Sequence, residues 1–207
     1  MVRPKKSEQK DIRQLVLVKS RNLFLKYGFG NITMRRIAED IGASPGAIYL
    51  YFKNKEAILA ELRKEGFALL DRAQQTVMDA HYADPMDKLI DMGKTYIQFG
   101  LTHREYYDIM FLMNCREHSA DPVPGIRSGE ALAGLRSFQK FRRVVDECKN
   151  AGSFSLADAD TVAFFCHSYA HGQVSLIIRQ RTPVAVEKET ILIDECMAFF
   201  SQMARGK

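Results

Sequence analysis

The sequence has few of the features that mark membrane or secreted proteins. It has no tryptophan, and only four cysteines and six prolines in 207 residues. No apolar run approaches the roughly 20 residues that a helix needs to cross a membrane, so we expect no membrane partner. The basic start at Met1–Lys6 precedes an apolar run, Leu15–Val18, that is too short for a signal peptide. We therefore expect a cytoplasmic protein.

The scarcity of cysteine argues against a disulfide or metal framework. No two of the cysteines have the Cys-x-x-Cys spacing of redox and metal motifs. Three of them lie in apolar helical contexts, which predicts buried free thiols in a reducing compartment. A redox sensor is the alternative, and it would use Cys115, which lies beside Arg116. The four cysteines are Cys115, Cys148, Cys166 and Cys196.

Sequence motifs for catalysis are also missing. The chain has no nucleophile elbow, no glycine-rich phosphate loop and no His-Glu-x-x-His motif. His167 and His171 have the i, i+4 spacing of a chelating pair, and Cys115 with His118 would add ligands. No acidic base accompanies the two histidines. Ser168 does not form a catalytic triad with them, because adjacent residues on a helix point in different directions. We therefore predict no enzyme, no cofactor and no metal site.

No strand pattern, repeat or low-complexity segment is present, so we predict an all-α fold of about nine helices. Ser155–Asp158 has the spacing of a capping box, and Pro183 blocks the helix that follows. Residues 115–127, with two prolines and a glycine, are predicted to form a loop. Helices are predicted at about residues 10–27, 55–80, 84–102, 105–114, 128–150 and 186–204. Two short helices are predicted within residues 33–55, and one further helix starts from the Ser155–Asp158 box and runs to about Arg181.

Charge is distributed unevenly along the chain. Residues 1–66 contain 14 Lys and Arg against 7 Asp and Glu, a balance of +7, whereas the remaining residues have a balance of −2. This asymmetry places a polyanion-binding surface in the first third of the chain. Arg3, Lys5 and Lys6 would extend that surface as an arm, or they belong to a tail that only adds solubility.

Residues 33–55 predict two short helices joined by a tight turn. Thr33 is a good N-cap for the first helix, and Gly42 ends it because glycine adopts a left-handed conformation without steric cost. The apolar face of this helix carries Met34, Ile37, Ala38 and Ile41.

The second of these helices begins almost without side chains. Ser44 is its predicted cap, Pro45 occupies its first turn, and Gly46 and Ala47 follow. Such a start permits close approach of the backbone to another surface and offers N–H groups to an anion. Hydroxyls and ammonium groups follow within two turns, on Tyr49, Tyr51, Lys53 and Lys55. We interpret the pair as a helix-turn-helix whose second helix enters the DNA major groove.

This stretch, with about twenty residues before it and ten after, resembles the N-terminal domain of the TetR family of transcriptional regulators. The resemblance implies a three-helix DNA-binding domain at residues 8–55 and a helical ligand-binding and dimerisation domain at residues 56–207. The helix at about 55–80 would connect the two. The residues that carry the resemblance are Thr33, Ile37-Ala38, Ile41-Gly42, Ser44-Pro45-Gly46, Ile48-Tyr49, Tyr51-Phe52 and Lys55.

The resemblance also implies roles in DNA binding. Each subunit would read one half of a near-palindromic double-stranded operator. Contacts with phosphate or sugar are predicted for Thr33, Arg36, Tyr49, Tyr51, Lys53 and Lys55. Proximity to bases is predicted for Arg35, Ser44, Pro45, Gly46 and Ala47.

The last helix is apolar on more than one face, so one side needs a partner. The resemblance implies a homodimer in which helices eight and nine of both subunits form a four-helix bundle. The alternative is that the last helix lies at the centre of a single subunit, where both of its apolar sides are buried without a second copy. The segment from His171 to Leu176 also resembles a TetR subfamily with a Trp-His-Gly motif, although this chain has no tryptophan. The predicted interface residues are Gly172, Ser175, Ile191, Met197 and Phe200.

Two segments mix aromatic, methionine and titratable side chains, which favours a cavity for a partly apolar small-molecule effector. The alternative is that these side chains only fill a core. The predicted lining is His103, Tyr106, Tyr107, Met110, Met113, Asn114, Phe164, Phe165 and His167.

The function predicted from the sequence is a dimeric DNA-binding regulator, in this family most often a repressor that a small molecule releases from its operator. The alternative is a ligand-binding or protein-interaction module that keeps the fold without binding an operator. A steep loss of affinity with rising salt would distinguish the first from the second.

Overall fold

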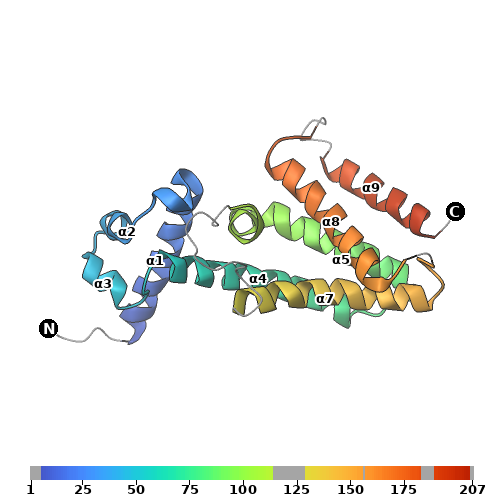
Figure 1. Ribbon diagram of the computed structural model, residues 1–207, viewed down its shortest axis with the longest axis horizontal. Helices are drawn as coiled ribbons and strands as arrows, with labels where there is room; N and C mark the ends of the chain where they lie inside the picture. The colour runs from blue at the N-terminus through green and yellow to red at the C-terminus, as the bar shows by residue number, and fades with distance from the viewer. Residues whose placement is uncertain (1–5, 114–128, 156, 183–188, 206–207) are drawn as a thin grey trace. The chain divides into compact units, whose positions relative to one another are not determined.

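The computed structural model describes residues 6–113, 129–155, 157–182 and 189–205. Within these residues the chain forms nine α-helices, a 3-10 turn (η1), a π-helical segment (η2) and no strand, which confirms the all-α prediction (Figure 1). In order these are α1 (Lys6–Tyr27), η1 (Phe29–Asn31), α2 (Met34–Ile41), α3 (Pro45–Tyr49), α4 (Lys55–Asp79), α5 (Pro85–Thr102), α6 (Arg104–Tyr107), η2 (Asp108–Leu112), α7 (Gly129–Asn150), α8 (Ala159–Ile178) and α9 (Glu189–Ala204).

Two local predictions need correction. The single helix predicted at residues 105–114 is a short α6 followed by the π-helical η2. The cap of α8 is Asp158, whose carboxylate accepts from the Thr161 N–H at 2.8 Å, and not Ser155. A carboxylate binds the positive end of a helix more strongly than a hydroxyl does, so it takes the capping position. The predicted loop at residues 115–127 and the predicted start of the last helix lie outside the described residues.

The chain packs as two compact units, which share α4. Unit 1 contains residues 1–66 and 105–130, and unit 2 contains residues 67–104 and 131–207. The core of unit 1 draws buried apolar side chains from α1, α2, α3, the first part of α4 and η2. Representative members are Phe24, Ile37, Ile48, Leu62 and Ile109. The predicted functional boundary at residue 55 remains a prediction.

Contacts of α6 and η2 explain why this segment belongs to unit 1. The Tyr106 hydroxyl donates to a Glu65 carboxylate oxygen at 3.0 Å. The Arg63 side chain donates to the Ile109 carbonyl at 3.0 Å. Gly66 has no side chain, and the Met110 thioether occupies the space where a Cβ would lie.

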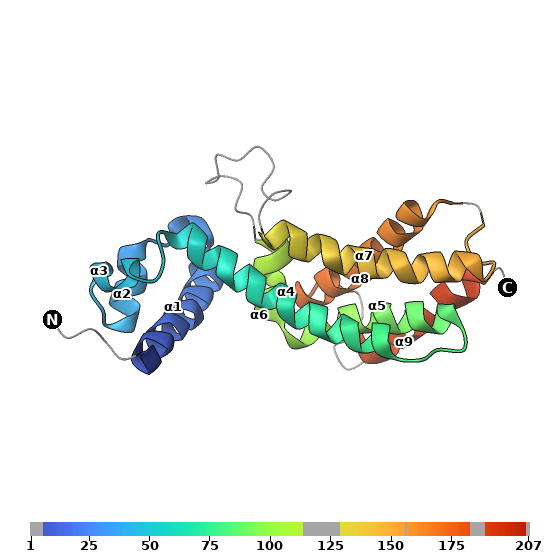
Figure 2. The same cartoon turned by 90° about the horizontal axis from the view of Figure 1, so that it is seen from below.

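Unit 2 is built around α5, which packs against α8 and α9. In both views α7 lies along the second half of α4 (Figure 1, Figure 2), where the Lys140 ammonium contacts Asp71 at 2.8 Å. Tyr96 and Phe141 are buried in the core of this unit, with ring centroids 6.1 Å apart. Gly93 lets α9 approach α5, because a Cβ there would lie 2.7 Å from Met197 Cε.

Candidate nucleic-acid interface

Local capping fixes α2 and α3. Thr33 Oγ1 accepts from the Arg36 N–H at 3.2 Å, and Ser44 Oγ accepts from the Ala47 N–H at 3.3 Å. Gly42 ends α2 with φ of 69°, in the left-handed region that favours glycine. The three predicted caps are confirmed, so residues within this segment set the turn between the two helices.

One face of α3 is buried and the other is open. Ile48 lies in the core of unit 1, which fixes the rotation of the helix. Ser44, Pro45 and Gly46 are exposed at its start, and Tyr49 is exposed one turn later. A Cβ at Gly46 would meet only Ser44 Oγ, at 4.0 Å. Folding of the described chain therefore does not require the bare start of α3, and the open surface leaves room for another molecule.

Basic side chains lie on the exposed surface of α2 and after α3. The Arg35 side chain is 81% exposed and forms an ion pair with Glu39 at 3.1 Å. Exposed ion pairs contribute little to stability, so this guanidinium can exchange its carboxylate for a phosphate. Arg36 and Lys53 are also exposed. Their predicted contacts with DNA stay predictions.

Two of the predicted phosphate ligands are engaged within unit 1. Lys55 Nζ donates to the carbonyls of Phe29, at 2.9 Å, and Gly30, at 3.4 Å, and lies 4.5 Å from the centroid of the Phe29 ring. Tyr51 is partly buried against the core. Lys55 thus stabilises the η1 turn, a role that its spacing in the sequence did not reveal. Any phosphate bound by Lys55 would share its ammonium with these carbonyls.

Sequence reasoning missed Leu50, which is 79% exposed directly after α3. The neighbouring apolar residues Ile48 and Phe52 are buried. An exposed apolar side chain beside a recognition helix can contact a thymine methyl group. The sequence pattern could have indicated this. Ile48 and Phe52 supply the apolar side chains with which this segment packs on the core, so Leu50 is left outside it.

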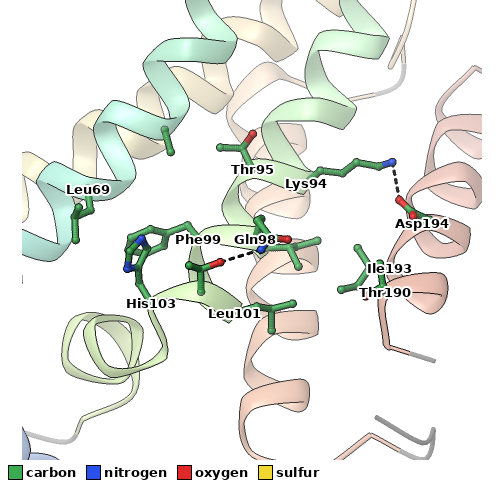
Figure 3. A pocket seen from close by; sticks show the side chains of 13 residues that line it. Leu69, Lys94, Thr95, Gln98, Phe99, Leu101, His103, Thr190, Ile193 and Asp194 are labelled. Atoms are coloured by element: carbon green, nitrogen blue, oxygen red, sulfur yellow. Dashed lines mark hydrogen bonds and ion pairs between the residues drawn. The ribbon is translucent and has the colours of Figure 1, made fainter. Parts of the chain in front are cut away.

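A cleft of about 490 Å³ opens in unit 2 between α4, α5 and α9 (Figure 3). Leu69 of α4, Phe99 of α5 and Ile193 of α9 are among its lining residues, with His103 directly after α5. His103 is the member of the predicted lining set that this cleft contains.

The other members of the predicted lining set need correction. Tyr106, Tyr107, Met110 and Met113 belong to unit 1, because the chain turns away from α5 at His103 and α6 packs against α1 and α4. Phe164 and Phe165 are exposed on α8, His167 packs in the core of unit 2, and Asn114 lies outside the described residues. Composition identified chemically suitable segments but not the direction in which each one packs.

His167 is surrounded by aromatic rings. Its ring centroid lies 5.0 Å from that of Tyr96 and 5.8 Å from that of Phe141. Burial lowers the pKa of His167 to about 4, with a smaller contribution from His171. Burial also lowers the pKa of His171, whose Nδ1 lies 3.3 Å from the Tyr96 hydroxyl oxygen. Both imidazoles are therefore neutral at pH 7.

Acid is expected to destabilise unit 2 through His167. The unfolded side chain titrates at its ordinary pKa of 6.5, whereas the folded side chain titrates at about 4. Between these values the unfolded state binds the additional proton, so the stabilisation is complete above pH 6.5 and is lost as the pH falls toward 4. Between pH 7.5 and pH 5 we expect His167 to account for a loss of about 2 kcal/mol in the free energy of unfolding.

Urea unfolding at the two pH values measures this difference. The matched variant His167→Asn cannot titrate in this range and is expected to lose that part of the pH dependence, whatever its stability at pH 7.5. An undiminished pH dependence in the variant would assign the effect to other groups.

The predicted dimer residues divide into two groups. Met197 and Phe200 are buried in the core of this chain and are therefore not exposed interface residues, which corrects the prediction. Ile191 is exposed, and Ser175 is partly buried. No heavy atom of the described residues, apart from the glycine's own helix backbone and chain neighbours, lies within 4 Å of a Cβ built at Gly172. The close helix contact predicted at Gly172 is thus not made within the described chain.

The thiols and histidines show no grouping suited to metal binding among the described residues. Burial raises the pKa of Cys148 and of Cys166 to about 12, which makes both thiols unreactive at neutral pH. Cys115 and His118 lie outside the described residues. No helix in the part of the chain that the structure describes is long and apolar enough to cross a bilayer.

Two family models match the chain. The model for bacterial regulatory proteins of the tetR family matches residues 16–62, which contain α2 and α3. The model for a tetracyclin repressor-like C-terminal domain matches residues 89–199. The likeness to the Trp-His-Gly subfamily stays a prediction.

Curated relatives match only part of the chain. The chain is 38% identical over 53 residues to the HTH-type transcriptional repressor Rv1474c of Mycobacterium tuberculosis, a match that covers 26% of this chain and 28% of that protein. It is 31% identical over 84 residues to the HTH-type transcriptional repressor AcnR of Corynebacterium efficiens, covering 41% and 43%. The chain thus spans less than half the length of these relatives.

Solved structures share the fold over nearly the whole chain. A Rhodococcus sp. RHA1 protein of unknown function superimposes with a TM-score of 0.71 and 24% identity, covering 94% of each chain. The ketosteroid transcriptional regulator KstR2 of Mycobacterium tuberculosis gives a TM-score of 0.68 and 17% identity, covering 92% of this chain and 93% of that one. With one family model on the helix-turn-helix and another over more than half of the sequence, the chain belongs to the TetR family of transcriptional regulators.

Proposed function

We propose that this regulator is a dimeric repressor that binds a near-palindromic operator and is released by a small-molecule effector. The observation that carries the proposal is the open start of α3, whose small residues are exposed, together with exposed basic side chains on α2 and after α3. The names of two curated relatives as repressors support the direction of regulation.

DNA contacts are divided between two sets of residues in this proposal. Ser44, Pro45, Gly46 and Ala47 approach base edges in the major groove, since they leave the start of α3 bare. Arg35, whose guanidinium is exposed on α2, reaches bases or the neighbouring phosphates. The phosphate and sugar contacts come from Thr33, Arg36, Tyr49 and Lys53, with smaller parts for Tyr51 and Lys55 because both are engaged within unit 1.

Exposed apolar side chains on α8 and α9 support the dimer. On α9, Ile191, Phe199 and Met203 fall at positions i, i+8 and i+12, which share one side of a helix. On α8, the exposed side chains of Phe164 and Leu176 and the partly buried Gly172 between them have the same spacing. We call these six residues the α8–α9 face. Exposed apolar groups of this extent mark an interaction surface, and a second copy of the chain is the partner we propose.

Release by an effector is proposed to act through α4. This helix places Ile58 and Leu62 in the core of unit 1, and Leu69 and Ala73 in the wall of the unit 2 cleft. A ligand that shifts α4 at the cleft would therefore move side chains in the core that supports α3. In a dimer, such a shift changes the separation of the two recognition helices.

Fluorescence anisotropy with labelled DNA from upstream of the gene tests operator binding. Specific binding should saturate, should exceed binding to a scrambled duplex of equal length, and should weaken steeply with rising salt. Equal affinity for both duplexes would overturn the operator proposal and favour a ligand-binding module without operator recognition.

Substitutions of Lys53 and Lys55 should have different effects, one on phosphate binding and the other on stability. Lys53→Ala is expected to weaken operator binding severalfold without changing thermal stability. It should also reduce the slope of log affinity against log salt by about 1.8, because the dimer loses one phosphate contact in each half-site. Lys55→Ala removes the hydrogen bonds to the η1 carbonyls and should destabilise unit 1 by about 1–2 kcal/mol. Anisotropy at four salt concentrations and thermal unfolding measure both variants. An unchanged salt slope for Lys53→Ala would remove Lys53 from the phosphate contacts.

A further inference from the structure

We propose that the unit 2 cleft binds an amphipathic anion, with an apolar ring system in the cleft and a carboxylate-type head on Lys94. This inference rests on the proposed effector function, and it names the chemistry of the effector and the side chain that selects it.

The cleft has the size and surface for an apolar body. Its volume of about 490 Å³ lies in the range of small-molecule sites. Leu69, Leu101 and Ile193 contribute apolar surface from three different helices (Figure 3). The rings of Phe99 and His103 lie together, with centroids 5.3 Å apart and planes at 42°. A flat ring system can pack against this aromatic pair.

A cation on α5 defines the preferred head group. Lys94 Nζ lies 2.7 Å from Asp194 Oδ1, so this ion pair joins α5 to α9 beside the cleft (Figure 3). The Asp194 side chain is 59% exposed and that of Lys94 is 42% exposed. An exposed ion pair contributes little net free energy, so a ligand anion that also gains apolar contacts can displace Asp194 from the ammonium.

The remaining lining groups favour an anion over a cation. Among the lining residues that the structure describes, Asp194 is the single acidic side chain, and Lys94 already neutralises it. An anion instead meets Lys94, with the hydroxyls of Thr95 and Thr190 available as further donors. Displacing Asp194 also breaks the ion pair between α5 and α9. Binding therefore changes the contacts of α9, the helix that carries part of the α8–α9 face.

Three probes with one ring system and different charges test the head group. Isothermal titration calorimetry of the full-length protein, without DNA, would compare 2-naphthoate, neutral 2-acetylnaphthalene and cationic 2-naphthylmethylammonium. We expect 2-naphthoate to bind about tenfold more tightly than the neutral probe, and the cation to bind most weakly.

Two variants and a control assign the preference to the ion pair. Lys94→Met should abolish the preference for 2-naphthoate while retaining the neutral probe. Asp194→Asn should increase the affinity for 2-naphthoate severalfold, because the competing carboxylate is gone. Arg136→Met removes an exposed charge on α7, which does not line the cleft, and should change nothing.

Equal affinity for the three probes, or an anion preference that survives Lys94→Met, would overturn the inference. Should Lys94→Met fail to fold, unchanged 2-naphthoate affinity in Asp194→Asn would overturn it equally. The outcome is separable from the proposed function, since 2-naphthoate binding without operator binding contradicts only the latter. Operator binding without an anion preference contradicts only the inference.

Discussion

A leucine at Gly46 is expected to abolish specific operator binding while leaving the fold intact. A Cβ at this position has no neighbour closer than Ser44 Oγ, at 4.0 Å, and Gly46 does not adopt the left-handed conformation that would strain another residue. Glycine is also a poor helix former, so Gly46→Leu should preserve or slightly raise thermal stability. The added side chain instead occupies the space that DNA must enter. We expect at least a ~100-fold loss of affinity, toward the level of non-specific binding.

The control for this variant is Ala68→Leu, which adds apolar bulk at an exposed position of α4. Anisotropy titrations and thermal unfolding of both variants, alongside the unmodified protein, give the comparison. Retained operator affinity in Gly46→Leu would mean that the start of α3 does not face DNA. A loss of thermal stability would mean that the glycine has a folding role that the geometry does not indicate.

The segment that could be predicted best is the one whose structure depends on local chemistry. Thr33, Gly42 and Ser44 act within three or four residues of their own positions, so the sequence suffices to place them. Ile37 and Ile48 follow from the apolar periodicity of the two short helices. The caps and the buried face together determine which side of α3 stays open.

Features that depend on contacts distant in sequence could not be predicted. Lys55 bonds to carbonyls more than twenty residues earlier, and no local pattern indicates that the chain returns there. The segment at residues 105–113 has the composition of a cavity wall, yet its contacts with Arg63 and Glu65 place it in unit 1. Composition limits what a segment can bind but does not determine which core it joins.

The last helix shows a related limit. Apolar residues occur on more than one face of α9. Periodicity in the sequence therefore could not distinguish the face that packs on α5 from the face that is exposed. Prediction favoured Met197 and Phe200 for an interface, whereas the fold buries both within the chain. Ile191, which was also predicted for the interface, is exposed. The exposure of Phe199 and Met203 follows only from the packing of α5 against α9.

Two adjacent phenylalanines of α9 should therefore respond in opposite ways to substitution. Phe199 is 61% exposed, and Phe200 is 7% exposed with its ring centroid 5.8 Å from that of Tyr169. Phe200→Ala leaves a cavity in the core and should cost about 3–5 kcal/mol in the free energy of unfolding. Phe199→Asp removes no core contact, so the monomer should keep its fold.

In the proposed dimer, however, two-fold symmetry places the aspartate in the interface twice, and each copy loses water without gaining a partner. We expect the dimer dissociation constant to rise by at least ~1000-fold, which corresponds to about 4 kcal/mol. Analytical ultracentrifugation measures this change directly. Operator affinity should fall with it, because a monomer reaches one half-site only. A Phe199→Asp protein that remains dimeric would place the dimer contact away from the α8–α9 face. A folded monomer that still binds the full operator with undiminished affinity would show that α3 recognises DNA without a paired subunit.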